Sequence, residues 1–209
     1  MSNRRERAGR WFARFATDRV VARPKLWRLF RRPVEKQFDR LAPVWDKRRG
    51  PESLMALGAA LDRLEPAPER ILDLGTGTGA AARVLARRFT DASVIGVDLS
   101  AEMIAEAGRL LPPELGDRVR FEQADAASLP FEDGSFDLVV LLNAIPFFDE
   151  LARVTKPGGA VVFSFSSGPA TPIYVPTDTL RNRLEPLGFA RFEDVEVGGG
   201  TSVLARLTA

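Results

Sequence analysis

The sequence contains neither cysteine nor histidine. Without thiols, a disulfide framework and thiolate metal sites are excluded, and an intracellular compartment fits best. Without imidazole, histidine-dependent catalytic triads are excluded and a zinc site is disfavoured. We therefore expect a cytoplasmic protein without a bound metal ion.

Long apolar runs are also lacking. The longest, residues 136–148, is interrupted by Asp137 and Asn143 and falls short of the roughly 20 residues that a spanning helix needs. The arginines near the start of the chain have no apolar signal-peptide core behind them. With 209 residues, 45% of them hydrophobic, the chain is large enough for one packed domain, or for one domain with an appendage.

The charges are unevenly distributed. Residues 1–49 hold 16 of the 30 Lys and Arg residues and 5 of the 28 Asp and Glu residues, a net charge of +11, and the remainder carries −9. We therefore predict a basic helical arm or lid over residues 1–50 and a cofactor-binding domain over residues 51–209.

Three interpretations of the basic arm remain open. The arm is a lid over a cofactor or a solvated flank. Alternatively, it makes a peripheral contact with an anionic membrane, because Trp11, Phe15 and Trp27 lie among its arginines. The third interpretation is that it binds nucleic acid, although no known nucleic-acid module is recognisable. Proline at positions 24, 33, 43 and 51 predicts short segments. One of them, from Val34 to Trp45, has helical spacing and should end or distort at Pro43.

Short apolar runs alternate with amphipathic stretches from residue 70 onward, which is typical of βα units around a parallel sheet. The expected strands are 70–74, 94–98, 119–123, 136–142, 160–165, 190–197 and 202–207. The expected helices are 52–64, 78–89, 101–111, 148–155 and 177–187. The last two strands are separated by three glycines and Thr201, too short a connection for a helical crossover, and should pair antiparallel. The predicted fold is α/β: a doubly wound, Rossmann-like, mostly parallel seven-stranded sheet with an antiparallel C-terminal hairpin strand and helices on both faces.

A glycine-rich turn follows the first of these strands, in the run ILDLGTGTG over residues 71–79. Side chains at Gly75 or Gly77 would obstruct a ligand lying against the backbone, and the turn calls for positive φ. Gly75, Gly77 and Ala80 also satisfy the dinucleotide fingerprint G-x-G-x-x-G/A, so the turn alone does not choose the cofactor.

An acid, Asp98, closes the next strand. A carboxylate at this place accepts hydrogen bonds from both hydroxyls of a ribose, as it does in NAD enzymes. The alternative role of Asp98, capping the following helix, is weakened by Ser100, which is better placed as the N-cap.

Further landmarks carry a resemblance to a known family. They are Asp73 two residues before the first glycine, Asp125 in a run of the form D-A…LPF…FDLV, and the turn ELARVTKPGG over residues 150–159. In this order they resemble the class I S-adenosylmethionine (SAM)-dependent methyltransferases, specifically the small-molecule, type 11-like branch. The segment from Phe38 to Asp46 is similar to another family motif, with Trp45 where a tyrosine is common.

The resemblance implies SAM as the cofactor. The glycine turn would surround its methionine part, Asp73 would organise the ammonium end, and Asp125 would bond the adenine amino group. The cofactor-binding residues that it implies are Asp73, Gly75, Thr76, Gly77, Gly79, Asp98, Leu99, Met103, Asp125, Ala126 and Asn143.

Methyl transfer from a sulfonium is an in-line displacement, so a dedicated base is needed only if the acceptor must lose a proton. Asn143, at the end of a strand, would face the transferred methyl group or simply form a turn. Asp149 and Tyr174 are candidate bases, or else a surface acid and a packed aromatic. Apolar residues in 145–148 and 169–176 should lie over the pocket mouth and suit an apolar or aromatic, quinol-like acceptor.

We therefore expect a methyltransferase that acts on a small molecule. The alternatives are a non-catalytic SAM-binding protein, since no base is evident, an RNA methyltransferase that uses the basic arm, and, more remotely, an NAD(P)-dependent oxidoreductase. The lack of a second, substrate-handling domain weighs against the oxidoreductase.

Overall fold

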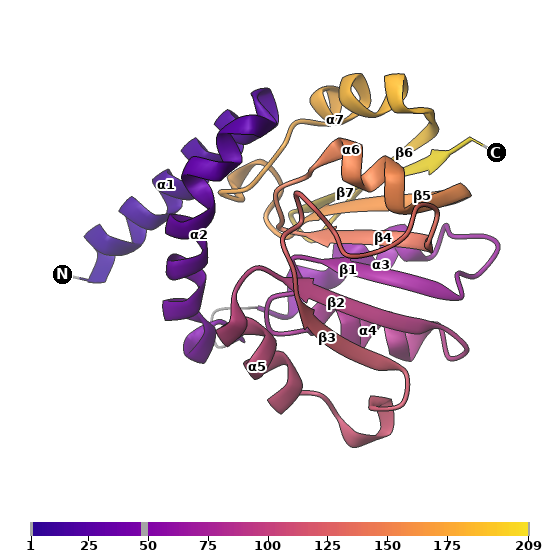
Figure 1. Cartoon of the computed structure of the whole chain (residues 1–209), viewed down its shortest axis with the longest axis horizontal. Helices are drawn as coiled ribbons and strands as arrows, with labels where there is room; N and C mark the ends of the chain where they lie inside the picture. Colours follow the sequence, from indigo (N-terminus) through magenta and orange to yellow (C-terminus); the bar gives the residue numbers. More distant parts are fainter. Residues whose placement is uncertain (1, 47–49, 209) are drawn as a thin grey trace.

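The computed structural model describes residues 2–46 and 50–208. Its centre is a seven-stranded sheet with the order β3-β2-β1-β4-β5-β7-β6 (Figure 1). The strands are β1 (Arg70–Leu74), β2 (Ser93–Asp98), β3 (Val119–Gln123), β4 (Phe136–Leu142), β5 (Thr155–Phe165), β6 (Phe189–Val197) and β7 (Gly200–Leu207).

Strands β1 to β5 pair in parallel, whereas β7 is antiparallel to both β5 and β6. Six strands therefore share one direction and β7 opposes them, which confirms the predicted fold class. The turn between β6 and β7 consists of Gly198 and Gly199, with φ of 61° and 77°. Positive φ at both central residues is the geometry of the hairpin turns that match strand twist, and glycine adopts it without strain.

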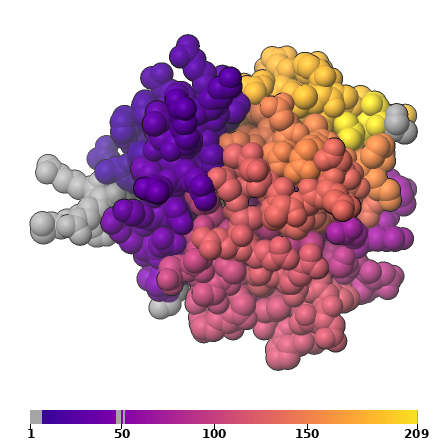
Figure 2. All heavy atoms as spheres, viewed as in Figure 1, coloured from indigo at the N-terminus to yellow at the C-terminus, as the bar shows by residue number. Residues whose placement is uncertain are grey.

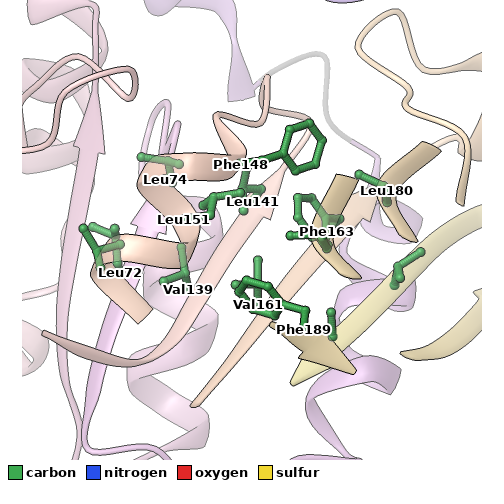
Figure 3. Close-up of a cluster of buried hydrophobic side chains, with 14 of the residues drawn as sticks. Leu72, Leu74, Val139, Leu141, Phe148, Leu151, Val161, Phe163, Leu180 and Phe189 are labelled. Atoms are coloured by element: carbon green, nitrogen blue, oxygen red, sulfur yellow. The ribbon is translucent and has the colours of Figure 1, made fainter. Parts of the chain in front are cut away.

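Helices cover both faces of the sheet. They are α3 (Met55–Leu61), α4 (Ala80–Arg88), α5 (Ala101–Arg109), α6 (Phe148–Val154) and α7 (Thr177–Leu184), with short 3-10 turns at Pro51–Leu54, Pro113–Leu115, Gly168–Ala170 and Glu185–Leu187. Helices α3 and α4 pack on one face, against Ile71 and Val140, and helices α6 and α7 pack on the other, against Leu72 and Val139. Successive strand residues point to opposite faces, so β1 and β4 contribute to both cores. Figure 3 shows the core beneath α6 and α7.

The N-terminal arm consists of α1 (Ser2–Ala22) and α2 (Trp27–Leu41), joined through the 3-10 turn Pro24–Leu26 and followed by another at Ala42–Val44. Its own small core contains Ala16, Val20, Trp27 and Val34, and it packs against Phe147 of the domain. In Figure 2 the arm forms one side of the molecule.

The prediction that every proline divides the arm was wrong at Pro33, which lies inside α2. Proline removes one helical hydrogen bond, but here its side chain is exposed and the buried residues Trp27 and Val34 hold the helix on the domain. Helix α2 does end at Leu41, immediately before the turn that contains Pro43. The prediction of a helix end or distortion at Pro43 is confirmed.

Several boundaries differ from expectation by a few residues, and the largest difference is at the start of β5. Strand β5 begins at Thr155 instead of residue 160, because its pairing with β4 continues past a register shift between Phe136 and Leu138. The helix expected over 52–64 is shorter, since a 3-10 turn precedes α3. Within residues 2–46 and 50–208, no helix combines the length and apolar character needed to cross a bilayer.

Candidate functional site

A cavity of about 890 Å³, including its open mouth, lies at the carboxyl ends of β1, β2 and β4, beneath the arm. This is the position at which open α/β sheets bind ligands, because the strand order reverses direction there. The lining residues come from the glycine turn, the loops after β2, β3 and β4, the arm and the segment before α7.

The glycine turn forms one wall of the cavity. Gly75 and Gly77 have φ of 72° and 55°, and a Cβ on Gly75 would lie 2.6 Å from the Cβ of Ala144. The backbone N–H groups of Gly75 and Thr76 both donate to the carbonyl of Val97 at 2.9 Å. These contacts fix the turn beside β2, and only glycine fits at position 75.

Asp73 organises this turn from inside the protein. Its carboxylate is fully buried, and Oδ2 accepts hydrogen bonds from Thr76 Oγ1 at 2.5 Å and from the backbone N–H of Ala82 at 2.9 Å. The second bond fixes the first turn of α4 relative to β1. Asp73 does not line the cavity, so any influence on a ligand passes through the turn.

Asp98 places a carboxylate on the cavity wall. Its Oδ2 accepts the backbone N–H of Gly77 and its Oδ1 that of Ser100, both at 2.9 Å. Burial raises the pKa of Asp98, an effect that these backbone N–H groups partly oppose. Ser100 accepts the N–H of Met103 at 3.1 Å and is the N-cap of α5, as expected. Each carboxylate oxygen keeps a lone pair for a further donor, so Asp98 suits a diol.

An apolar slot adjoins Asp98. Leu99, Met103 and Ala126 line it from the domain, and Trp27 lines it from α2. Asp125, next to this slot, does not line the cavity. Its Oδ1 accepts the indole N–H of Trp27 at 2.8 Å, and its Oδ2 is 3.0 Å from Nε of Arg31.

The predicted cofactor residues thus fall into two groups. Those on the cavity wall are Gly75, Thr76, Gly77, Asp98, Leu99, Met103, Ala126 and Asn143. Those behind it are Asp73, Gly79 and Asp125. Gly79 is needed for another reason, since a Cβ there would lie 2.6 Å from the ring of Phe121.

The end of β4, the loop after it and the segment before α7 supply apolar walls, formed by Leu142, Ala144, Ile145, Phe147 and Ile173. As expected, residues from the segments 145–148 and 169–176 border the pocket, namely Ile145, Phe147 and Ile173. Phe148 is buried in the core beneath α6 instead.

Asn143 lines the cavity immediately after the end of β4. Its φ is 54°, unusual for a residue other than glycine. Its Nδ2 donates to Ser166 Oγ and its Oδ1 accepts the Ser166 N–H, each at 2.9 Å. These bonds join the ends of β4 and β5 and fix the side chain at the cavity wall.

The two candidate bases lie away from the cavity wall. Asp149 is exposed in the first turn of α6. Tyr174 packs edge-on against Phe165 at 5.0 Å, beneath Arg14 of the arm. Within the described part of the chain, Asp98 is the only ionisable residue among those lining the cavity.

The arm supplies four lining residues, Trp27, Val34, Phe38 and Trp45. Trp45 belongs to the segment whose resemblance to a family motif was noted in the sequence. It packs against Phe38 with ring centroids 5.5 Å apart, and its Nε1 would lie 3.4 Å from a Cβ at position 77. Trp27 and Val34 were missed, and their signal was a seven-residue spacing on one face of α2.

The segment before the domain is joined to the glycine turn by polar contacts. Thr78 Oγ1 donates to Asp46, and Arg83 of α4 lies 3.2 Å from the same carboxylate. These contacts connect the end of the arm to the first helix of the domain. The arm is thus part of the cavity wall and is attached at both sides of it.

Comparison with known proteins agrees with this geometry. Residues 71–159 match the profile of a methyltransferase domain family. A demethylmenaquinone methyltransferase of Thermus thermophilus is 41% identical over 140 residues, covering 60% of this chain and 62% of the relative. A malonyl-[acyl-carrier protein] O-methyltransferase of Halorhodospira halophila is 40% identical over 151 residues, covering 68% and 50%. The chain therefore spans less than two thirds of the length of these relatives.

A solved structure has the same fold. The SAM-dependent methyltransferase of Aquifex aeolicus superimposes with a TM-score of 0.62 at 21% sequence identity, over 78% of this chain and 96% of the other. Identity at this level supports the fold alone.

Proposed function

Because this chain belongs to the class I SAM-dependent methyltransferases, we propose that its cavity binds SAM and that the protein transfers the methyl group to a small, neutral, apolar acceptor. The observation that carries the proposal is a single cavity lined by Asp98 and the glycine turn together with apolar side chains such as Ile145 and Phe147. A mostly apolar cavity with a few placed polar groups suits a nucleoside cofactor and an apolar acceptor.

The polar groups of the cavity fit SAM. Asp98 would accept hydrogen bonds from the two ribose hydroxyls, and the backbone of Gly75 to Gly77 would border the methionine part. The adenine ring would lie in the slot between Leu99, Met103 and Trp27. No Cβ projects from either glycine, so a ligand can lie directly against the turn.

The role of Asp125 departs from the family pattern. Instead of facing the cavity, its carboxylate is bonded to Trp27 and Arg31 of α2. We assign to it the positioning of Trp27 as the cover of the adenine slot. The arm would then complete the cofactor site.

The bound cofactor would supply an electrophilic methyl carbon on a sulfonium. The residues of this chain would exclude water and align the acceptor with that carbon, which is the main requirement of an in-line displacement. Ile145, Phe147 and Ile173 form the dry walls on the acceptor side. Asn143, held by Ser166, would border the site of transfer with an amide dipole.

The cavity favours a neutral acceptor over a carboxylate. One relative is named for a menaquinone precursor and the other for a malonyl carrier protein. An anionic acceptor in an apolar cavity needs a cation to offset its lost hydration. Within the ranges that the structure describes, the cavity walls include no Lys or Arg, so a quinol-like ring fits these walls better.

Two measurements test the proposal. Titration with SAM, S-adenosylhomocysteine and NAD should show micromolar binding of the first two and none of the third; the reverse would indicate an oxidoreductase. Transfer of labelled methyl groups should then be detectable with apolar hydroquinones, and not with short carboxylates or RNA. Binding of SAM without transfer to any acceptor in the panel would instead indicate a non-catalytic SAM-binding protein.

A further inference from the structure

The outer side of the arm carries a stripe of positive charge. On α2, Arg28, Arg32, Lys36 and Arg40 recur every four residues and are all exposed. On α1, Arg7 and Arg19 are exposed as well. Within residues 7–46, which the structure describes throughout, Asp18 is the one acid in the exposed class. This surface therefore favours an anionic partner.

The same side exposes large apolar side chains. Trp11 is 66% exposed and Leu29 is 62% exposed, the highest values among the large hydrophobic residues described. Trp11 stacks on Phe15 with ring centroids 5.4 Å apart, and Phe15 meets Phe30 of α2 edge-on at 5.9 Å. An aromatic cluster thus bridges the two helices at the surface, bordered by arginines.

Apolar contacts extend from this aromatic cluster toward the cavity. Phe30 also contacts Phe12, at 6.3 Å between ring centroids. Phe12 lines a second, small hollow between α1, α2 and the domain. This hollow shares Val34, Phe38, Ile145 and Ile173 with the main cavity. Apolar side chains of the arm and the domain therefore lie between the two hollows.

We propose that the outer side of the arm docks on an anionic lipid surface, and that an apolar acceptor passes from it between α1 and α2 into the cavity. Exposed Trp and Leu surrounded by Arg and Lys are the pattern of helices that lie in the membrane interface. Each cation close to an anionic leaflet adds to the attraction. The docking stands by itself, whereas the passage of an acceptor rests on the proposed methyl transfer.

Charge argues against a second copy of the chain as the occupant. Two copies meeting through this side would bring Arg28, Arg32 and Lys36 of one against those of the other, and like charges repel. Nucleic acid would satisfy the cations and stack on Trp11, but it offers no apolar phase for Leu29. A lipid surface satisfies both kinds of side chain.

Vesicle flotation with the full chain tests the docking. The protein should float with vesicles of phosphatidylcholine containing 30% phosphatidylglycerol, and not with phosphatidylcholine alone. Reversing three charges, R28E/R32E/K36E, should weaken binding by about a hundredfold, from several-fold per charge. The matched control R87E/R120E/R191E changes exposed arginines of the domain and should bind normally.

The apolar contribution is tested by W11A/L29A. Both side chains are exposed, so the fold should be retained while vesicle affinity falls by about tenfold or more. The control is Met55→Ala, which removes a half-exposed apolar side chain from α3. Absence of wild-type binding to the anionic vesicles would overturn the proposal. The proposal would also be overturned if the arm variants bound the vesicles as tightly as wild type. It would fail as well if the arm charges supported binding of RNA instead of lipid, or if the wild type formed dimers that W11A/L29A dissociated.

The passage is tested by filling it. Ala13→Trp places a large side chain in the second hollow, and should lower turnover of a vesicle-borne hydroquinone by tenfold or more with SAM affinity retained. Ala8→Trp, exposed on the same helix, is the control. Normal turnover in Ala13→Trp would refute the passage even if docking holds. If the wild-type protein does not bind SAM, the proposed function is refuted, whereas the docking result is unaffected.

Discussion

The indole Nε1 of Trp27 donates a hydrogen bond to Oδ1 of Asp125 across 2.8 Å, joining α2 to the loop that follows β3. Arg31, one helical turn further along α2, lies 3.0 Å from the other oxygen of the same carboxylate. Asp125, which was expected to contact the cofactor, thus holds Trp27 at the cavity wall.

Trp27→Phe tests this attachment, because it keeps an aromatic ring and removes the N–H donor. A double-mutant cycle with Asp125→Asn, read from denaturant unfolding, should give a coupling free energy of about 1–2 kcal/mol. Hydrogen exchange should quicken in α2 and stay unchanged in α7. Additive effects in the cycle would contradict a direct bond between these two side chains.

Asp98→Asn should weaken SAM binding by about tenfold to a hundredfold, the usual effect of losing a hydrogen bond to a charged group. Asp91→Asn, an exposed acid before β2, is the control and should bind normally. Calorimetric titration measures both. An unchanged affinity in Asp98→Asn would remove this residue from the ribose site.

The pH dependence of SAM binding follows from the same residue. Burial raises the pKa of Asp98 above its ordinary 3.8, so Asp98 takes up a proton at a higher pH than an ordinary aspartate does. As the pH is lowered, the affinity of the wild type for SAM should therefore begin to fall at that higher pH. The sign for stability is opposite: the folded chain takes up this proton more readily than the unfolded one, so protonation of Asp98 stabilises the ligand-free fold. The affinity of Asp98→Asn for SAM, measured between pH 4 and 8, should not show this fall at low pH.

Gly75→Ala combines an unfavourable positive φ with the overlap against Ala144. We expect a loss of about 2–3 kcal/mol in the free energy of unfolding, together with loss of SAM binding. Adding Ala144→Gly relieves only the overlap and should restore part of that stability. Gly108→Ala in α5, where a Cβ meets nothing within 4 Å, should instead leave stability equal or raise it by about 0.5–1 kcal/mol.

Arg153 connects the end of α6 to the loop before β4, with hydrogen bonds to Glu150, to Asp133 and to the carbonyls of Leu129 and Phe131. Arg153→Met should lower the free energy of unfolding by about 2 kcal/mol near neutral pH. Arg109→Met removes a similar i,i+3 pair with Glu106 at an exposed site and should have little effect.

The effect of Arg153→Met should also depend on pH. Arg153 holds the pKa of Glu150 below its ordinary 4.5. The ion pair therefore contributes fully above that value and is lost as the pH falls through the lowered pKa. Unfolding curves at pH 7 and pH 3 should show the wild-type advantage shrinking at the lower pH, and an equal advantage at both would rule out the ionic contribution.

The sheet was predictable because its determinants are local. Alternating apolar runs gave the strands, and the glycines after residue 197 predicted the antiparallel pairing of β6 with β7. The cavity wall on the domain side followed for the same reason, since Gly75, Gly77 and Asp98 each come at the end of a parallel strand.

The arm was less predictable because its structure depends on distant contacts. Pro33 predicts a break by local rules, but the burial of Trp27 and Val34 against the domain overrides it. Likewise, nothing close to Asp125 in the sequence reveals that Trp27 and Arg31 occupy its oxygens. Trp27 and Asp125 are 98 residues apart in the sequence, so they meet only because the arm packs against the domain.

The position of β7 between β5 and β6 has a consequence for biosynthesis. The ribosome completes β5 before β7, and until Gly200–Leu207 are available one edge of β5 has no pairing partner. Unpaired strand edges promote association between nascent or partly folded chains. The stage most vulnerable to aggregation should therefore be the interval in which β1 to β5 are assembled and the closing strand has yet to insert.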